Sequence, residues 1–255
     1  MHLETIVERF DEELRTDDYA DLDGSPNGLQ VGPDSNTVDH VAFAVDAAAE
    51  TIDAAVEAGA DLLVTHHGLV WGSLERVTGR TYDRFAPLFE HDLALYVSHL
   101  PLDGHQELGN AAGVADVLGL EERDPFGSYG PEHVGQTGIL PDPTTVDSLE
   151  TTLEAGLETG GRPVQVLPFG PDEVERVAIV TGSGVDWLEE ALEVGADVLV
   201  TGEGKQQVYH EAKEAGIHVV LAGHYATETF GVRALMQEAS AWGLETTYLE
   251  QPTGL

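Results

Sequence analysis

The sequence predicts an α/β protein built from two similar halves, with sheets that are flanked by helices. Strand-like and helix-like patterns alternate along the chain, which is the order found in α/β folds. The chain also repeats itself, because residues 56–68 (VEAGADLLVTHHG) and 192–204 (LEVGADVLVTGEG) match at eight of thirteen positions. Two copies are too few for a repeat array and indicate an internal duplication. The 255 residues are enough to bury a substantial core.

The first half is predicted to cover residues 1–125. It opens on an amphipathic helix, because Leu3, Ile6, Phe10 and Leu14 share one helical face. The patterns that follow predict three strands, at 40–46, 61–65 and 93–99. They also predict three helices, at 47–59, 81–91 and 109–120.

The second half is predicted to cover residues 126–255. A Gly/Pro-rich connection (DPFGSYGPEH) leads into it and precedes a strand at 134–140 and a helix at 145–158. The pattern of the first half then returns, with RVAIVT aligned on HVAFAV at the same offset of 136. We expect the two halves to form one compact unit.

Charge is the strongest signal in the composition. Acidic residues number 47 and basic residues 11, which gives a formal net charge of −36 and opposes binding to nucleic acid and to anionic membranes. Only Lys205 and Lys213 are lysines, and the carboxylates are scattered along the chain, as in proteins of salt-accumulating halophiles. We expect the acidic start not to act as a signal peptide, and no stretch approaches the roughly 20 apolar residues of a membrane helix. We therefore expect a cytoplasmic protein.

Metal chemistry is the chemistry that the residue types favour. The chain has no cysteine, which excludes thiol catalysis and thiolate ligands. Histidines and carboxylates fall at or just after predicted strand ends, where ligands gather in α/β sheets, and such side chains suit a site for two divalent ions. These residues are His66, His67, His99, Asp103, His210, His224 and Glu228.

The duplication extends to part of this set. LYVSHLPLD (95–103) aligns with VLAGHYATE (220–228) at an offset of 125, which places His99 over His224 and Asp103 over Glu228. Each half therefore ends a strand with the pattern His-x-x-x-carboxylate. We expect Thr227 to cap a helix whose first turn holds Glu228 near His224.

His66 and His67 pose a geometric question, because neighbours in a regular strand point to opposite faces of the sheet. One ring would then be buried without a role. The alternative is that the strand opens at THHG, with Gly68 relaxing the backbone. We expect the second arrangement, in which each ring approaches one of two metals about 3.5–4 Å apart.

Several weaker motifs have two interpretations. Arg76, Arg80 and Arg84 have helix-like spacing and either pair with acidic neighbours, which we favour, or hold a substrate phosphate. VTGSG (180–184) is either a tight turn or a cradle for an anion. The other polar candidates are interpreted as turn or pocket groups (Asn27, Gln30), as a loop residue that either faces solvent or touches the site (His105), and as surface or satisfied histidines (His40, His91, His133, His218).

Six segments occur in order over nearly the whole chain: SPNGLQVG, LLVTHHGLVWG, SHLPLDGHQELGNAAGVADVLGL, VAIVTGSG, VLVTGEGKQQVYHEA and GHYATETFGVRAL. Together they resemble the Nif-three-like dinuclear metal centre family, whose members are often named GTP cyclohydrolase I type 2 homologues. The resemblance implies a metal site between the two α/β halves, two divalent ions per chain, and a toroidal homohexamer of the compact form. The identity of the ions remains open, because sites built from histidines and carboxylates accept Fe, Mn, Zn, Co or Ni.

Carried over by position, the resemblance implies metal ligands at His66, His67, Asp103, His224 and Glu228. His99 and His210 match family histidines near the site and are our candidates for proton transfer. The chain departs from the family at Glu203, where an aspartate usually stands, and at Gly68, where many members have proline.

Two functions of different classes follow. The first is a metal-dependent hydrolase, in which a metal-activated water attacks a small molecule such as a nucleotide or another phosphate-containing substrate. The alternative is non-enzymatic: metal storage, metal delivery, or insertion of metal into a metallocofactor. A regulatory or scaffolding role is a third possibility, favoured only if metal is absent.

Overall fold

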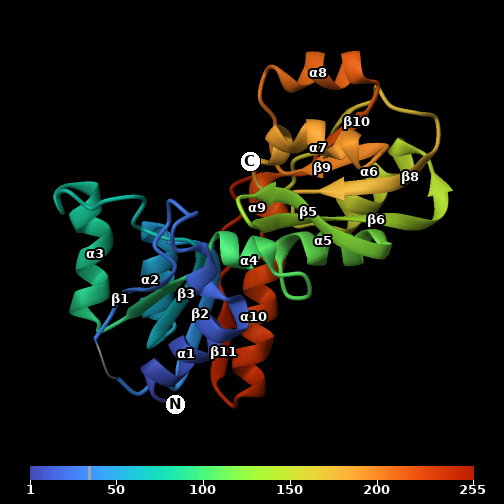
Figure 1. Cartoon of the computed structure of the whole chain (residues 1–255). Helices are drawn as coiled ribbons and strands as arrows, with labels where there is room; N and C mark the ends of the chain where they lie inside the picture. The colour runs from blue at the N-terminus through green and yellow to red at the C-terminus, as the bar shows by residue number, and fades with distance from the viewer. Residues whose placement is uncertain (34–35) are drawn as a thin grey trace. The chain divides into compact units, whose positions relative to one another are not determined.

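The computed structural model describes residues 1–33 and 36–255 (Figure 1). These residues form two compact units, each with its own sheet and core. The first unit contains Met1–Leu102 and Gly231–Gln251, and the second contains Asp103–Phe230 and Pro252–Leu255.

The division into units differs from the expected boundary between residues 125 and 126 and from the expectation of one unit. The chain enters the second unit at Asp103 and returns to the first at Gly231. The return has a simple cause, because the strand formed by Glu245–Tyr248 pairs in parallel with a strand of the first unit. No strand is predicted at 245–248, and a local sequence pattern does not show which sheet a strand joins.

The first unit is built on a five-stranded sheet with the order β1-β4-β3-β2-β11. All neighbours are parallel except β1, which runs antiparallel to β4 at one edge. The central strands are buried on both faces, which explains their continuous apolar runs. The strands are β1 (Gly28–Val31), β2 (His40–Asp46), β3 (Leu62–His67), β4 (Ala94–Val97) and β11 (Glu245–Tyr248).

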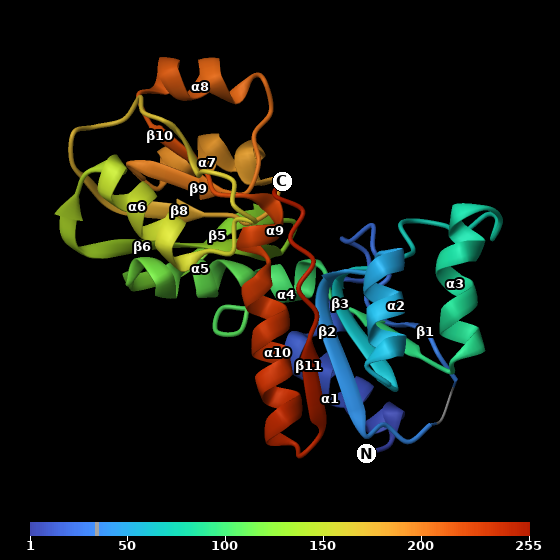
Figure 2. The ribbon, with the colours of Figure 1, turned by 180° about the vertical axis from the view of Figure 1, so that it is seen from behind.

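Helices cover both faces of this sheet (Figure 2). On one face, Ile52 and Ala55 of α2 and Phe85 and Leu88 of α3 pack on alternate side chains of β2, β3 and β4. On the other face, the Phe10 ring of α1 packs against Tyr96 of β4. The helices are α1 (Leu3–Leu14), the 3-10 turn η1 (Thr16–Tyr19), α2 (Ala49–Glu57), α3 (Arg80–Glu90) and α10 (Thr229–Ala241), whose first two residues belong to the second unit.

The second unit is built on a six-stranded sheet with the order β5-β6-β8-β9-β10-β7. Its central strands β8, β9 and β10 are parallel, and the others are antiparallel to their neighbours. The strands are β5 (Glu121–Tyr129), β6 (Glu132–Thr144), β7 (Gln165–Leu167), β8 (Val174–Ile179), β9 (Val198–Thr201) and β10 (His218–Leu221).

Helices α5 and α6 share one core with the central strands of this sheet, and α7 lies on the opposite face (Figure 1). Thr145 begins α6 as its N-cap, accepting a hydrogen bond from the backbone N–H of Ser148. Among the described residues, no helix is long and apolar enough to span a membrane. The remaining helices are α4 (Leu100–Gly104), α5 (Asn110–Leu118), α6 (Val146–Gly156), η2 (Gly184–Trp187), α7 (Leu188–Glu193), α8 (Val208–Ala215) and α9 (His224–Thr227).

The predicted α/β class with two similar halves is confirmed. Each unit has three parallel strands in the same order, β2-β3-β4 and β8-β9-β10, flanked beyond the third strand by an antiparallel edge strand. The matching extends to single hydrogen bonds. Asp61 accepts two backbone N–H bonds at the start of β2, at 2.8 and 3.0 Å, and Asp197 accepts two at the start of β8, both at 2.9 Å. The two aspartates are 136 residues apart, which is the offset of the sequence repeat.

The Gly/Pro-rich segment expected as a connection is instead largely strand. Residues 121–129 form β5, which pairs with β6 in a long hairpin, and Pro125 lies opposite Gln136. Proline is tolerated there because β5 is the edge strand of its sheet. The predicted strand at 134–140 lies inside the longer β6.

Candidate metal centre

The three histidines of the first unit lie together at the carboxyl ends of two adjacent parallel strands. His66 and His67 end β3, and His99 follows β4 by two residues. The ring centroids of His66 and His67 are 4.6 Å apart, and that of His99 lies 5.1 and 5.7 Å from them. One ring nitrogen of each histidine lies within 4.8 Å of the other two, a spacing that suits a metal site.

The expectation that β3 ends before its two histidines is wrong. Both belong to the strand, since His67 is paired in register with Asp46 of β2. The rings nevertheless lie side by side rather than on opposite faces, as their 4.6 Å centroid separation shows. Both rings therefore join one cluster at the end of the strand, although both residues belong to the strand.

The Nδ1 atoms of these two rings are fixed by acceptors. His66, which is fully buried, donates from Nδ1 to the backbone carbonyl of Ser98 at 2.9 Å. The Nδ1 atom of His67 lies 2.8 Å from the carboxylate of Asp46. With the proton held on Nδ1, the lone pair of each neutral ring is on Nε2. Histidines that bind metals through Nε2 are typically held by such an acceptor at Nδ1.

His99 is held in the same way by a carboxylate from the first loop of the chain. Its Nδ1 lies 2.9 Å from Asp23, which also accepts a hydrogen bond from Asn27, and the Asn27 side chain in turn accepts the backbone N–H of His99 at 2.7 Å. Burial alone would raise the pKa of Asp23, but the hydrogen bond and positive charge of His99 outweigh it and lower that pKa to about 2. Asn27 therefore orients the loop that holds His99.

Gln30 braces the loop that follows the two histidines. Its side-chain carbonyl accepts the backbone N–H groups of Leu69 and Val70 at 3.1 and 3.2 Å, and its amide donates to the Pro26 carbonyl at 2.8 Å. Gly68 makes room for this bridge, because a Cβ there would lie 2.6 Å from the end of the Gln30 side chain. The residue after the histidine pair is thus constrained by packing.

Replacing Gly68 by alanine is expected to destabilise the first unit by about 1–2 kcal/mol, because Gln30 must give up its two loop hydrogen bonds. Denaturant unfolding measures the change. Gln30→Ala provides the matched control and should cost a similar amount. The double variant should cost no more than either single one, so additive effects would contradict this account.

The second unit carries a separate cluster of one imidazole and two carboxylates. Nε2 of His224 lies 3.2 Å from Glu228, and its Nδ1 lies 3.3 Å from Glu203. Burial alone would lower the pKa of His224, but the hydrogen bond and charge of Glu228, followed by those of Glu203, raise it to about 9. A hydrogen bond from the Ser183 hydroxyl is the main reason that the pKa of Glu203 is lowered.

The expected helix cap at Thr227 is replaced by a different arrangement. His224–Thr227 form the short helix α9, and Glu228 lies between it and α10. The Thr227 hydroxyl accepts the backbone N–H of Gly182 at 3.2 Å and so ties VTGSG to this helix. The Gly184 amide is bonded to Thr201 at 2.8 Å. Because these two amides are already bonded, the tight-turn interpretation of VTGSG is the better one.

Two glycines leave the space that the cluster fills. A Cβ on Gly182 would lie 2.3 Å from the Glu228 carboxylate and 3.2 Å from Nε2 of His224. A Cβ on Gly202 would lie 2.7 Å from the Cα of His224. Gly202 occupies the position that His66 has in the first half, at the offset of 136. The two halves thus share a backbone plan, while close packing excludes a side chain at this point of the second.

Gly182→Ala is expected to displace Glu228 and lower metal binding, besides the cost of alanine at a φ of +58°. Gly195→Ala is the matched control, since its φ is +71° and no described atom lies within 4 Å of the added Cβ. The control should lose about 1 kcal/mol of stability and keep its metal. Equal metal content in the two variants, measured by elemental mass spectrometry, would contradict this role for Gly182.

Asp103, the first residue of the second unit, is buried in a polar setting. Its carboxylate accepts hydrogen bonds from the Asn110 amide at 2.8 Å and the Thr181 hydroxyl at 3.2 Å. Neither partner was singled out from the sequence. Thr181 lies in the VTGSG motif, but Asn110 has no signal of its own, because a lone asparagine at the start of a helix is usually a surface residue.

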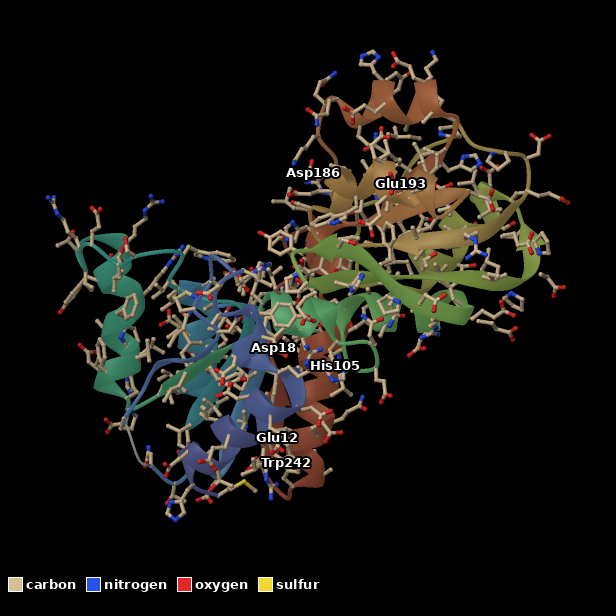
Figure 3. All side chains as sticks on the ribbon, viewed as in Figure 1. Glu12, Asp18, His105, Asp186, Glu193 and Trp242 are labelled. Atoms are coloured by element: carbon tan, nitrogen blue, oxygen red, sulfur yellow. The ribbon has the colours of Figure 1, made fainter. Side chains whose placement is uncertain are left out.

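The structure brings His210 into neither cluster. It lies exposed on α8, where its ring contacts the ring of Tyr209. His105, labelled in Figure 3, accepts the backbone N–H of Leu108 and so orders its own loop. His218 is a satisfied structural histidine, as predicted, since it is buried and bonded to Pro171.

The three arginines of residues 76–84 do not form the ion pairs that we favoured. Arg76, Arg80 and Arg84 are all exposed, and within 1–33 and 36–255 none of them has an acidic partner. Other cations of the chain do pair, as Arg123 does with Asp116 at 2.7 Å. The arginines of this segment are thus solvated rather than neutralised.

Comparison with known proteins adds the family. The model of a family described as Duf34/NIF3 (NGG1p interacting factor 3) matches residues 1–253. A Halobacterium salinarum protein named GTP cyclohydrolase 1 type 2 homolog is 59% identical over 255 residues, covering 100% of both chains. A protein of the same name from Archaeoglobus fulgidus is 40% identical over 256 residues, again covering 100% of both.

Solved structures agree with the sequence relatives. The crystal structure of TTHA1606 from Thermus thermophilus is similar over 100% of both chains, with a TM-score of 0.90 and 39% sequence identity. The match spans the strand ends that carry the clusters described above. With a family model that covers almost every residue and full-length relatives well above 30% identity, this chain belongs to the Duf34/NIF3 family.

Proposed function

We propose that this protein binds two divalent metal ions per chain and uses them for hydrolysis of a small molecule. The proposed ligands are His66, His67, Asp103, His224 and Glu228, which match the family positions. Asp103 lies in α4, four residues after His99, and is the first residue of the second unit.

The observation that carries the proposal is that the imidazole rings of His66 and His67 are held in one orientation by contacts at Nδ1. Buried or half-buried histidines with Nδ1 held by a carbonyl or carboxylate present Nε2 in one orientation, as metal ligands do. The cluster of the first unit therefore has a donor set and geometry that fit a divalent metal.

The second unit supports the same interpretation. Its imidazole and carboxylate lie within 3.2 Å of each other in a space kept open by Gly182. When bound, two divalent ions would lower the pKa of a water molecule and stabilise developing negative charge. Fe, Mn, Zn, Co and Ni all suit such donors.

His99 is the residue that we assign to proton transfer. It lies beside the two proposed ligands of β3, and the hydrogen bond to Asp23 holds its ring in place. The low pKa of Asp23 keeps that partner a carboxylate at neutral pH, so it can stabilise a protonated imidazole. His210, which is exposed on α8, is the second candidate for proton transfer.

A metal-transfer role is the second candidate function. It agrees with the solvent access of the proposed ligands, because the side chains of His67 and His224 are 18% and 28% exposed. A storage, delivery or insertion protein needs such access for metal to leave. A catalytic site is equally served by it, since the substrate must reach the ions.

Turnover decides between the two functions. Protein purified in high salt and loaded with each metal would be tested on nucleotides, phosphoesters and small amides, beside a His99→Gln variant. Hydrolysis that the variant lowers about 100-fold would support the enzyme. No turnover, combined with rapid metal transfer to a chelating acceptor, would reject hydrolysis and support delivery.

The remaining family properties are proposed with the site. We propose a cytoplasmic homohexamer that binds no nucleic acid, and light scattering after gel filtration tests the assembly.

We also propose that the acidic surface, which includes Glu12, Asp18 and Glu193 in Figure 3, is an adaptation to high salt. The Tm should then increase as the KCl concentration is raised from about 0.1 M to about 2 M, because salt screens the repulsion among carboxylates.

A further inference from the structure

Trp71 is a large aromatic residue that lies against the histidine cluster and also faces solvent. Its ring centroid is 5.0 Å from that of His99, in an edge-on contact, and 6.1 Å from that of His67. The side chain is 49% exposed. About half of this large side chain therefore stays open to solvent beside the histidines, which leaves area for a second ring to pack on the indole.

The backbone around Trp71 is held in place, which separates it from an exposed tryptophan on a loose loop. The N–H of Gly72 donates to the carbonyl of Gly24 at 2.6 Å. Val70, the preceding residue, donates to the Gln30 side chain at 3.2 Å. Both neighbours of Trp71 are therefore fixed to the segment 24–30, which runs into β1 and also orients His99 through Asn27.

We propose that Trp71 is a stacking platform for the substrate, and that the substrate carries a flat heteroaromatic ring. This inference deepens the proposed function, on which it rests. A ring stacked on the indole would be held beside His67 and His99, where the proposed hydrolysis takes place. Stacking also suits a protein of net charge −36, because a neutral ring is not repelled and the contact is not screened by salt.

The other tryptophans make a clean reporter possible. Trp242 packs on Phe10, and Trp187 donates from its ring nitrogen to the Ser128 carbonyl, so both have structural contacts away from the histidines. Replacing both by phenylalanine leaves Trp71 as the sole tryptophan. The probes are adenosine and guanosine, with ribose 5-phosphate and tetramethylammonium as non-aromatic controls, added to protein already loaded with metal.

We expect either nucleoside to quench the Trp71 fluorescence saturably, and neither control to do so. In the otherwise unchanged protein, Trp71→Ala should weaken nucleoside binding about tenfold or more, and Trp71→Phe should weaken it less. Trp187→Phe should leave the affinity unchanged. The metal content of Trp71→Ala should equal that of the parent, which tests the platform separately from the metal centre.

Three results would overturn the platform. Equal nucleoside affinity in Trp71→Ala, or no binding of either nucleoside, would exclude it. Quenching by tetramethylammonium alone would show a cation site instead. Loss of metal in Trp71→Ala would show that the indole supports the histidines. Absence of metal in the parent protein would instead reject the proposed function itself, on which this assignment depends.

Discussion

Asp103→Ala is expected to lower the metal content from about two ions per chain to fewer than one. The carboxylate is buried and held in place by hydrogen bonds from Asn110 and Thr181, so it is positioned to bind metal without rearrangement. A carboxylate ligand would also supply negative charge that offsets the charge of the divalent ions, so its loss should weaken binding strongly. Elemental mass spectrometry on protein purified in high salt, without chelating resin, measures the change.

The control for Asp103 is a substitution that removes an acidic charge elsewhere. Asp116→Ala removes the exposed partner of Arg123 and should leave metal content unchanged. Asp103→Asn should also lose metal while keeping the size of the side chain, which separates ligand loss from a packing defect. Two metals per chain in both Asp103 variants would remove this residue from the site. No metal in the reconstituted parent would make the histidine cluster structural.

The internal duplication predicted where the aligned histidines and carboxylates of the two halves lie. His99 and His224 were paired by an offset of 125, and each lies just beyond the carboxyl end of the third parallel strand in its unit. Asp103 and Glu228 followed from the same alignment. The strand-end rule places these residues well because the backbone is the same in both halves.

The carboxylates that orient the histidines were missed for two different reasons. Asp46 ends the predicted strand HVAFAVD, so the rule that selected His66 would also have selected it. Asp23 had no such signal, because it lies in a loop and is one of 47 acidic residues. Its contact with His99 joins residues 76 apart in sequence, and such pairings follow from tertiary structure alone.

The strand through THHG shows a limit of a different kind. Glycine after the histidines predicted a loop, but cross-strand pairing with Asp46 extends the strand through His67. A local sequence pattern does not report such pairing. The prediction that the two rings lie in one cluster was right, but the prediction that the strand ends before them was wrong.

Metal affinity is expected to rise steeply between pH 7 and pH 9, because metal must displace the proton that His224 holds. Glu228 and Glu203 raise the pKa of this imidazole to about 9. Competition with one proton lowers the apparent affinity about tenfold for each pH unit below that value, or about 100-fold at pH 7. Calorimetry in buffers of different ionisation enthalpy should find about one proton released per chain from His224 at pH 7.

The metal-free protein should show the opposite trend. A histidine whose pKa is raised on folding stabilises the fold fully below its ordinary value of 6.5, and this contribution is lost as the pH rises through about 9. The Tm of metal-free protein should therefore fall over this range, while that of metal-loaded protein should rise. His224→Gln should remove both trends.

Glu203→Gln separates proton competition from loss of a ligand. It keeps the proposed ligands but removes one of the charges that raise the pKa of His224, so the pH at which metal affinity levels off should move downward. Glu193→Gln removes an exposed charge from α7 and should leave the profile unchanged. If Glu203→Gln instead abolishes binding at every pH, then Glu203 is itself a ligand, at the position where the family usually has an aspartate. An unchanged profile would mean that the proton of His224 does not compete with metal.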